Sequence, residues 1–197
     1  PAKAPPLIIE AIESDSANYF TEDLMDLADH SDVCWLGSAP LNNYFDIEVI
    51  IAEILKQGAI PLSIGGDHSI TYPILRAMSD SYPSLSILHF DAHGDLYDSL
   101  GGNRHSHASP FARIMEEGLA QALTQVGIRT LNDHQQTQVS KFGVKVIDMR
   151  NWSPDIDLNL SGTVYLSFDM DVLDPAFAPG VSHHEPGGFT TREVLRM

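Results

Sequence analysis

Residues 164–171 have the sequence Val-Tyr-Leu-Ser-Phe-Asp-Met-Asp, in which an apolar run ends in two carboxylates. Residues 85–91, Leu-Ser-Ile-Leu-His-Phe-Asp, follow the same plan. Short apolar runs bounded by polar clusters are typical of strands. Side chains two residues apart on a strand point to the same side of it. Asp169 and Asp171 are therefore expected to face one centre at the point where their strand ends.

The rest of the chain alternates predicted helices with predicted strands. The expected helices cover residues 21–28, 46–57, 72–79, 108–117 and 132–142, and another begins at Thr190 or Thr191. The expected strands cover residues 33–37, 59–64, 85–90, 123–128, 144–148 and 164–168. Thr21 and Asp46 are expected as helix caps, and Gly58 ends a helix as glycine commonly does. This alternation predicts an α/β fold in three layers, αβα, with a mostly parallel sheet and right-handed crossovers.

Length and composition indicate a single α/β domain over residues 1–197. A chain of 197 residues, 43% hydrophobic and 19% charged, is long enough to form one sizeable core. No apolar run approaches the ~20 residues that a membrane helix needs, so no membrane span is expected. The single cysteine, Cys34, excludes an intramolecular disulfide and suits the reducing cytoplasm. It is expected to be a buried strand residue.

The formal net charge of -16 argues against a nucleic-acid partner. Phosphate backbones are bound by clustered Lys and Arg, of which the chain has only 11. The negative charge is compatible with attraction of a small cationic substrate. A surface that keeps the protein in solution is the more general explanation, and part of the charge belongs to the acidic motifs.

Three motifs supply hard oxygen and imidazole ligands. They are Gly65-Gly66-Asp67-His68, Asp91-Ala92-His93-Gly94-Asp95 and Ser167-Phe168-Asp169-Met170-Asp171. Each follows an apolar strand candidate, and ligands of open α/β sheets gather at the carboxyl ends of strands. So many carboxylates in one place repel one another strongly unless cations are present. The sequence therefore predicts a two-metal site.

The ordered set of these motifs, followed by Asp174-Pro175-Ala176-Phe177-Ala178-Pro179-Gly180, resembles the ureohydrolases, the family of arginase and agmatinase. The resemblance extends over the whole chain, and the set is far more specific than any one motif. It implies hydrolysis of a guanidinium compound to urea and an amine at a dimanganese centre. It also implies a homo-oligomer, typically a trimer or a hexamer.

The resemblance also implies a set of metal ligands. One Mn²⁺ would be held by His68, Asp91, Asp95 and Asp169. The other would be held by His93, Asp91, Asp169 and Asp171, so that two of the carboxylates bridge. Oxygen-rich ligands with a minority of imidazole suit Mn²⁺. Two ions ~3.5–4 Å apart would lower the pKa of a shared water, and the resulting hydroxide would attack the guanidinium carbon.

Catalytic roles are implied for Asp95 and for His107, which matches the family histidine credited with proton shuttling or substrate contact. An imidazole titrates near neutral pH and is suited to proton transfer. His89 is expected to be buried and hydrogen-bonded rather than a ligand. Three further histidines belong either to the mouth of the cleft or to ordinary exposed loops: His105, His183 and His184.

Two positions favour a decarboxylated substrate such as agmatine. Arginases of the family place an asparagine, and further on an acid, where this chain has Tyr97 and Asn132. Against this, residues 181–188 and 106–109 look like the agmatinase-related arginases of plants. Arginase activity on L-arginine therefore stays as the alternative.

The chain is expected to be a fragment truncated at both ends, because it lacks the family's first and last strands and the glutamate that grips the guanidinium group. Two hypotheses of other kinds stay open. One is a ureohydrolase-fold protein that binds metal without hydrolysis, as a regulatory or scaffold subunit. The other is a two-metal phosphoesterase, although the motif segments lack basic groups for phosphate except Arg104.

Overall fold

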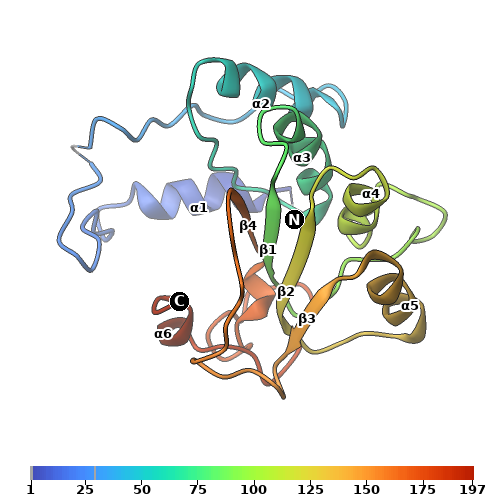
Figure 1. The fold of residues 1–197 in the computed structure, drawn as a ribbon. Helices are drawn as coiled ribbons and strands as arrows, with labels where there is room; N and C mark the ends of the chain where they lie inside the picture. Colours follow the sequence, from blue (N-terminus) through green and yellow to red (C-terminus); the bar gives the residue numbers. More distant parts are fainter. Residues whose placement is uncertain (1, 29) are drawn as a thin grey trace.

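The computed structural model describes residues 2–28 and 30–197, and four parallel strands form its central sheet (Figure 1). The strands are β1 (Ser86–Phe90), β2 (Ala122–Ile128), β3 (Lys145–Asp148) and β4 (Val164–Phe168). The helices of the described residues are α1 (Ala4–Ile12), α2 (Asp46–Lys56), α3 (Thr71–Ser79), α4 (Pro110–Glu116), α5 (Asp133–Phe142) and the short α6 (Thr191–Val194). Two 3₁₀ turns are present, η1 (His68–Ile70) directly before α3 and η2 (Met170–Val172) shortly after β4.

The strand order β3-β2-β1-β4 creates a switch point beside β1. The chain first moves outward from β1 to β2 and β3 through crossovers that contain α4 and α5, and then returns to the other side of β1 to form β4. Ligands of open α/β sheets bind in the crevice at such a reversal, outside the carboxyl ends of the strands. Phe90 pairs with Phe168, so the residues that follow them, Asp91 and Asp169, lie level at this crevice.

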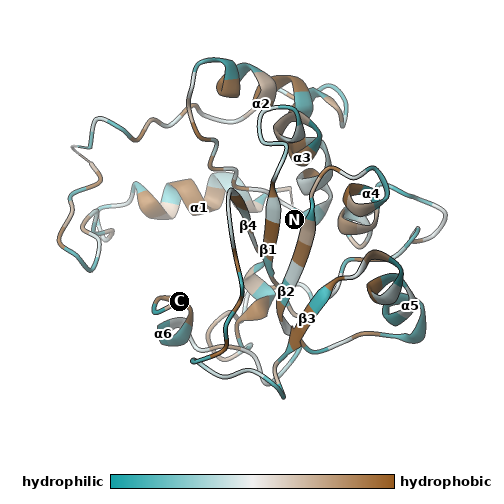
Figure 2. Ribbon diagram, viewed as in Figure 1, coloured by the Kyte–Doolittle hydropathy of each residue, from teal (hydrophilic) through white to brown (hydrophobic). Residues whose placement is uncertain are grey.

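Apolar side chains cover both faces of the sheet. Ile87 and Leu123 pack on one face, in a cluster with residues of α2, α3, α4 and α5. Leu88 and Val126 pack on the other face, against the connections that follow β3 and β4 and against α6. Figure 2 shows the hydrophobic stretches along β1, β2 and the helices beside them. The expected α/β architecture is therefore confirmed, with most of the helical cover on one face.

Local sequence signals account for most of the expected elements. In α5, Asn132 accepts a hydrogen bond from the Gln135 N–H and the Gln135 side chain reaches back to the Asn132 N–H, which is a capping box. Gly143 ends this helix with a φ of 65°. Asp46 is the first residue of α2 rather than its cap, although its carboxylate still accepts hydrogen bonds from the two backbone N–H groups three and four residues earlier.

Three predicted elements are wrong. Residues 21–28 form turns instead of a helix, and Leu24 has a φ of 62°, which a right-handed helix excludes. Residues 33–37 and 59–64 belong to no strand and have no ladder partner within the described ranges. Leu62 is 91% exposed. Apolar residues alone do not make a strand, because a strand needs a neighbour for its hydrogen bonds and a face to bury.

The N-terminal part of the chain lies beside the sheet with little packing. The sequence patterns do not predict α1, which has proline in its first turn, and none of its residues is buried although it is largely hydrophobic (Figure 2). Cys34 is exposed, so the expectation of a buried strand position is wrong.

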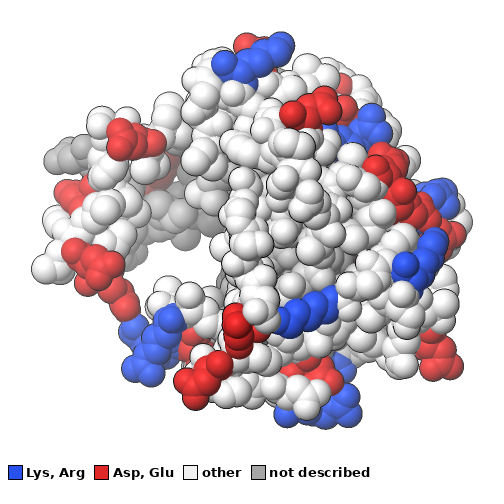
Figure 3. Space-filling model, viewed as in Figure 1, with Lys and Arg blue, Asp and Glu red and all other residues white. Residues whose placement is uncertain are grey.

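Within residues 2–28 and 30–197, no helix has the length and apolar character to span a bilayer. On the face drawn in Figure 3, Lys and Arg are scattered among Asp and Glu.

Candidate metal centre

His68 faces three carboxylates at the crevice between β1 and β4. Its Nδ1 atom lies 3.1 Å from Asp91 Oδ2, 3.3 Å from Asp95 Oδ2 and 3.4 Å from Asp169 Oδ2. The histidine belongs to η1, and the carboxylates belong to the segments that follow β1 and β4. The motifs that the sequence places at strand ends therefore meet in space.

A second histidine faces the other oxygen of Asp91. His93 Nδ1 lies 3.4 Å from Asp91 Oδ1 and 3.1 Å from Asp171 Oδ2. Asp91 thus turns one oxygen toward each histidine, which is the arrangement of a carboxylate that bridges two ions. Ligand atoms in adjacent positions around an ion, with bonds of about 2.1–2.3 Å, lie about 3.0–3.3 Å apart. The contacts of Asp169 run to His68, and its expected bridging role stays a prediction.

Backbone geometry places these side chains. Asp67 accepts a hydrogen bond from the N–H two residues on and so caps η1, which carries His68. Asp169 caps η2 in the same way, by accepting from the Asp171 N–H. Asp95 has a φ of 46°, in the left-handed region that residues other than glycine seldom adopt. Such strain persists only where the surrounding structure holds it, and it is concentrated at functional sites.

The crowded carboxylates alter the ionisation of every group in the centre. Burial, with the negative charge of Asp91, raises the pKa of Asp95 to about 7. Burial also raises the pKa of Asp171. The carboxylates of Asp171 and Asp91 raise the pKa of His93 to about 11. Burial opposes the charged form of His68, but the carboxylates around it still raise its pKa well above the usual value. Burial also disfavours the charged forms of Asp91 and Asp169, but the pKa values of these two are instead lowered, because the histidines beside them favour their charged forms.

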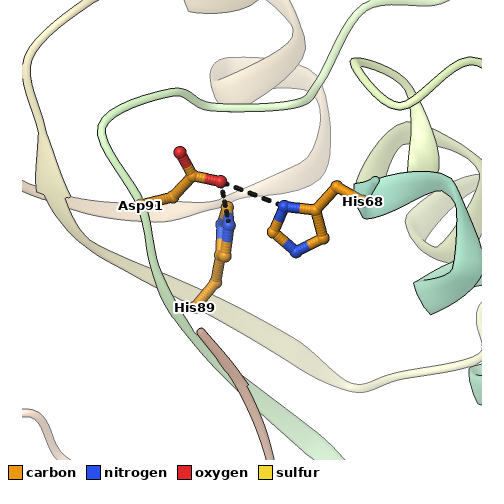
Figure 4. Close-up of side chains that lie close together, drawn as sticks. All are labelled: His68, His89 and Asp91. Atoms are coloured by element: carbon orange, nitrogen blue, oxygen red, sulfur yellow. Dashed lines mark hydrogen bonds and ion pairs between the residues drawn. The ribbon is translucent and has the colours of Figure 1, made fainter. Parts of the chain in front are cut away.

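Two side chains outside the ligand set orient its members. Figure 4 shows the rings of His68 and His89 directed at one oxygen of Asp91. His89 is buried, accepts at Nδ1 from Gln125 Nε2 (3.0 Å), and donates from Nε2 to Asp91 Oδ2 (2.8 Å). His89 is therefore buried and hydrogen-bonded at both ring nitrogens, as its sequence context predicts, and it orients Asp91. Ser167 Oγ lies 2.8 Å from His68 Nε2, which leaves Nδ1 to face the carboxylates.

The donor set fits divalent cations. His68 Nδ1 is buried and makes no hydrogen bond, a situation that costs free energy unless another group satisfies the atom. Four carboxylates share the crevice with two imidazoles, and buried negative charges need compensation by positive charge. Hard oxygen atoms with some imidazole nitrogen suit Mn²⁺ and related divalent ions. The residues present are thus the residues that a two-cation centre requires.

The proton-transfer histidine expected from the sequence lies exposed near this centre. The ring of His107 stacks on the ring of His183, with centroids 6.3 Å apart. The ring of His183 in turn lies 5.9 Å from the ring of His93. His107 and His183 therefore lie on the His93 side of the centre, and both are exposed.

The two remaining histidines make other contacts. The ring of His105 lies against Tyr44 and Tyr72, with centroid distances of 5.4 and 5.5 Å, so it fastens its loop to the α2 and α3 side. His184 Nε2 lies 3.1 Å from the backbone oxygen of Pro179 within its own exposed loop. Neither side chain reaches the carboxylates of the centre through a contact in the described residues.

The fold and the centre define an α/β protein with a candidate two-cation site at the switch point of its sheet. The family model described as Arginase family matches residues 2–197, and the chain belongs to this family. The chain is 45% identical to "Arginase 1, mitochondrial" of Arabidopsis thaliana over 217 residues, which cover all of this chain and 64% of that protein. It is 37% identical to guanidinopropionase of Pseudomonas aeruginosa over 82% of this chain and 57% of that protein.

A solved structure supports the same assignment. Arginase from Medicago truncatula superposes with a TM-score of 0.86 and 43% identity, over 98% of this chain and 67% of that chain. The resemblance to the ureohydrolases and the arginase-like fold are thereby confirmed. This chain spans 64% of the length of the Arabidopsis relative. The plant relatives are named arginases, so the expected preference for agmatine gains no support from them.

Proposed function

We propose that the protein hydrolyses a guanidino compound to urea and an amine with the help of two divalent cations, with L-arginine as the first candidate substrate and agmatine as the second. One observation carries the proposal: Asp91 directs Oδ2 to His68 Nδ1 and Oδ1 to His93 Nδ1. A carboxylate placed in this way would serve as a ligand to both ions. Bound there, the ions, expected to be Mn²⁺, would act as Lewis acids and lower the pKa of an attacking water.

The side chains of the protein would hold the ions and transfer protons. The ligands on the His68 side would be that histidine, Asp91, Asp95 and Asp169, and those on the other side would be His93, Asp91, Asp169 and Asp171. His107 is exposed to solvent close to His183, and an imidazole transfers protons efficiently near neutral pH. A ring nitrogen of His107 would therefore carry a proton between solvent and the departing amine. The carboxylate of Asp95, on the buried side, would complete the coordination of the first ion.

The segment after the second ligand motif bears on the choice of substrate. Asn132 Nδ2 donates a hydrogen bond to the Tyr97 hydroxyl at 2.6 Å, and the Tyr97 ring stacks on His134. These groups offer hydrogen bonds and not negative charge, and on this ground the sequence favours agmatine. The identities of 45% and 43% to plant arginases support L-arginine at least as strongly. We therefore place L-arginine first.

Urea release after incubation with Mn²⁺ tests the proposal. L-arginine, agmatine and 3-guanidinopropionate are compared by kcat/KM, and the largest value is expected for L-arginine. A larger value for agmatine would restore the preference inferred from Tyr97 and Asn132. Absence of urea from all three compounds, in a protein that binds two equivalents of Mn²⁺, would favour the binding-only hypothesis. The Asp91→Asn variant serves as the inactive control.

Assembly, location and partners remain predictions for this chain. The family resemblance predicts a trimer or a hexamer, which light scattering of the purified protein would test. The relative in Arabidopsis carries "mitochondrial" in its name, whereas the sequence of this chain predicts a cytoplasmic protein. A small cationic substrate, and no nucleic acid, is the partner that the net charge favours.

A further inference from the structure

The rings of His68 and His93 have similar surroundings in the centre. Each directs Nδ1 at carboxylates, and each has a different group at Nε2. For His68 this group is the Ser167 hydroxyl, 2.8 Å away. For His93 it is Glu185, whose Oε1 lies 3.6 Å from Nε2. The Nδ1 atom of His93, on the opposite side of the ring, lies 3.1 Å from Asp171 Oδ2.

The backbone that follows Glu185 is held by hydrogen bonds and by close packing. Asp174 Oδ2 accepts hydrogen bonds from the N–H groups of Gly187 at 2.7 Å and Gly188 at 3.3 Å. Gly188 lies so close to the end of η2 that a Cβ there would come within 2.5 Å of the Val172 carbonyl oxygen. The loop therefore returns to the crevice along a defined path, and Glu185 precedes this clamp by two residues.

The carboxylate of Glu185 has no competing ion pair among the described residues. Arg129 is close enough for the charge of Glu185 to act on it, but it directs Nη1 to the backbone oxygen of Val172 and Nη2 to that of Asp171. The side chains of Glu185 and His93 are 33% and 24% exposed, so their contact is partly shielded from water. The imidazole of His93 is thus the charged or polar partner available to Glu185.

We propose that Glu185 is a positioning residue for the second cation: its carboxylate faces the Nε2 edge of His93 across 3.6 Å, an ion-pair contact longer than a direct hydrogen bond. The negative charge at this edge favours the tautomer that carries the proton on Nε2 and has a free lone pair on Nδ1, and it favours the ring orientation toward Asp91 and Asp171. A carboxylate behind a ligand histidine also makes the imidazole a stronger donor to a metal ion. The inference rests on the two-cation centre proposed above. It assigns to Glu185 no direct contact with ion or substrate.

Metal titration of Glu185 variants tests the assignment. Outer partners of metal ligands typically contribute about 10–100-fold to metal affinity. Glu185→Ala should therefore weaken one of the two Mn²⁺ equivalents by about that factor in calorimetry and leave the other unchanged. Glu185→Gln, which retains an oxygen acceptor without the charge, should lose less. His184→Ala, a neighbour directed at Pro179, is the matched control and should bind both ions as the wild type does.

Two variant proteins, His68→Ala and His93→Ala, distinguish a positioning role of Glu185 from a general effect of its replacement on the fold. In His68→Ala, which leaves the ion on the His93 side, adding Glu185→Ala should weaken the remaining ion. In His93→Ala, adding the same change should have no further effect, because the partner of Glu185 is gone. The visible spectrum of the Co²⁺-loaded protein reports the altered geometry at the same position. If Glu185→Ala misfolds by circular dichroism, Glu185→Gln carries the comparison.

The outcomes distinguish this inference from the proposed function. A wild-type protein that binds two ions, with Glu185→Ala equal to it in both affinities, overturns the role of Glu185 and leaves the function intact. If Glu185 only positions His93, Glu185→Gln and Glu185→Ala should not lose Mn²⁺ affinity equally. Equal losses of Mn²⁺ affinity in the two variants, together with a loss that persists when Glu185→Ala is added to His93→Ala, would show that Glu185 is a direct ligand and would also overturn the positioning role. A wild-type protein that binds no Mn²⁺ overturns the proposed function itself.

Discussion

Replacement of Asp91 by asparagine is the most direct test of the centre, because this residue serves both histidines. Its side chain is 1% exposed, and its two oxygens face His68 and His93 separately. Asparagine keeps the shape and one oxygen, but its amide nitrogen has no lone pair for a metal ion. Loss of an outer partner alone costs about 10–100-fold in metal affinity, so loss of a charged ligand shared by both ions should cost at least about 100-fold for each.

The expected size of the effect follows from linkage. With free Mn²⁺ at about 100 times the dissociation constant of the wild type, one bound ion stabilises the fold by about 2.7 kcal/mol. For a chain of this length this free energy corresponds to a Tm increase of about 5–11 °C. A 100-fold weaker site at the same concentration retains about 0.4 kcal/mol, or about 1–2 °C. The metal-dependent rise in Tm should therefore nearly disappear in Asp91→Asn.

The assay is thermal unfolding with and without Mn²⁺, combined with metal analysis after dialysis. The metal-free variant should be less stable than the metal-free wild type, because, against the cost of burial, the histidines around Asp91 hold its pKa well below the usual value, so its negative charge is favourable there. The comparison is therefore made on the Mn²⁺-dependent rise in Tm within each protein. Asp155→Asn, an exposed aspartate far along the chain in the connection before β4, is the matched control and should keep the full increase. Two equivalents of Mn²⁺ bound to Asp91→Asn with unchanged affinity would refute the bridging geometry.

Three further predictions concern neighbouring groups. Because the pKa of His93 is raised to about 11 and that of Asp95 to about 7, the metal-free centre holds protons at pH 7. Mn²⁺ binding should therefore release at least one proton, and the affinity for Mn²⁺ should rise from pH 6 to 8. Calorimetry in buffers of different ionisation enthalpy measures the number of protons released. Uptake of protons on Mn²⁺ binding would contradict this prediction. His89→Ala should weaken the binding of both Mn²⁺ equivalents by about 10–100-fold, since the ring of His89 donates a hydrogen bond to the shared Asp91. A loss confined to one ion would count against the role of His89 in orienting Asp91. His107→Ala should retain both ions and lose turnover by about 10²–10⁴-fold in a urea assay; unchanged turnover would remove His107 from proton transfer.

The sequence by itself determined the elements whose signals are local. The apolar run of β4 ends at Phe168 as predicted, and α5 begins directly after its cap Asn132 and ends before Gly143, because capping groups a few residues apart specify both ends. Two of the candidate metal ligands were also within reach, since ligands of open α/β sheets gather at the carboxyl ends of strands and Asp91 and Asp169 directly follow β1 and β4. The positions of Asp171 in η2 and of His68 in η1, which follows a segment that is no strand, depended on the tertiary structure.

Only the tertiary structure decided what depends on a neighbour. Residues 33–37 and 59–64 have the composition of strands but no partner within the described residues, and pairing is what makes a strand. The contacts between the histidines and their partners join residues that are far apart along the chain. The separation is 99 positions between Ser167 and His68, 36 between Gln125 and His89, and 92 (185 − 93) between Glu185 and His93. No local pattern encodes such contacts, because a hydrogen bond or an ion pair depends on distance in space and not on separation along the chain.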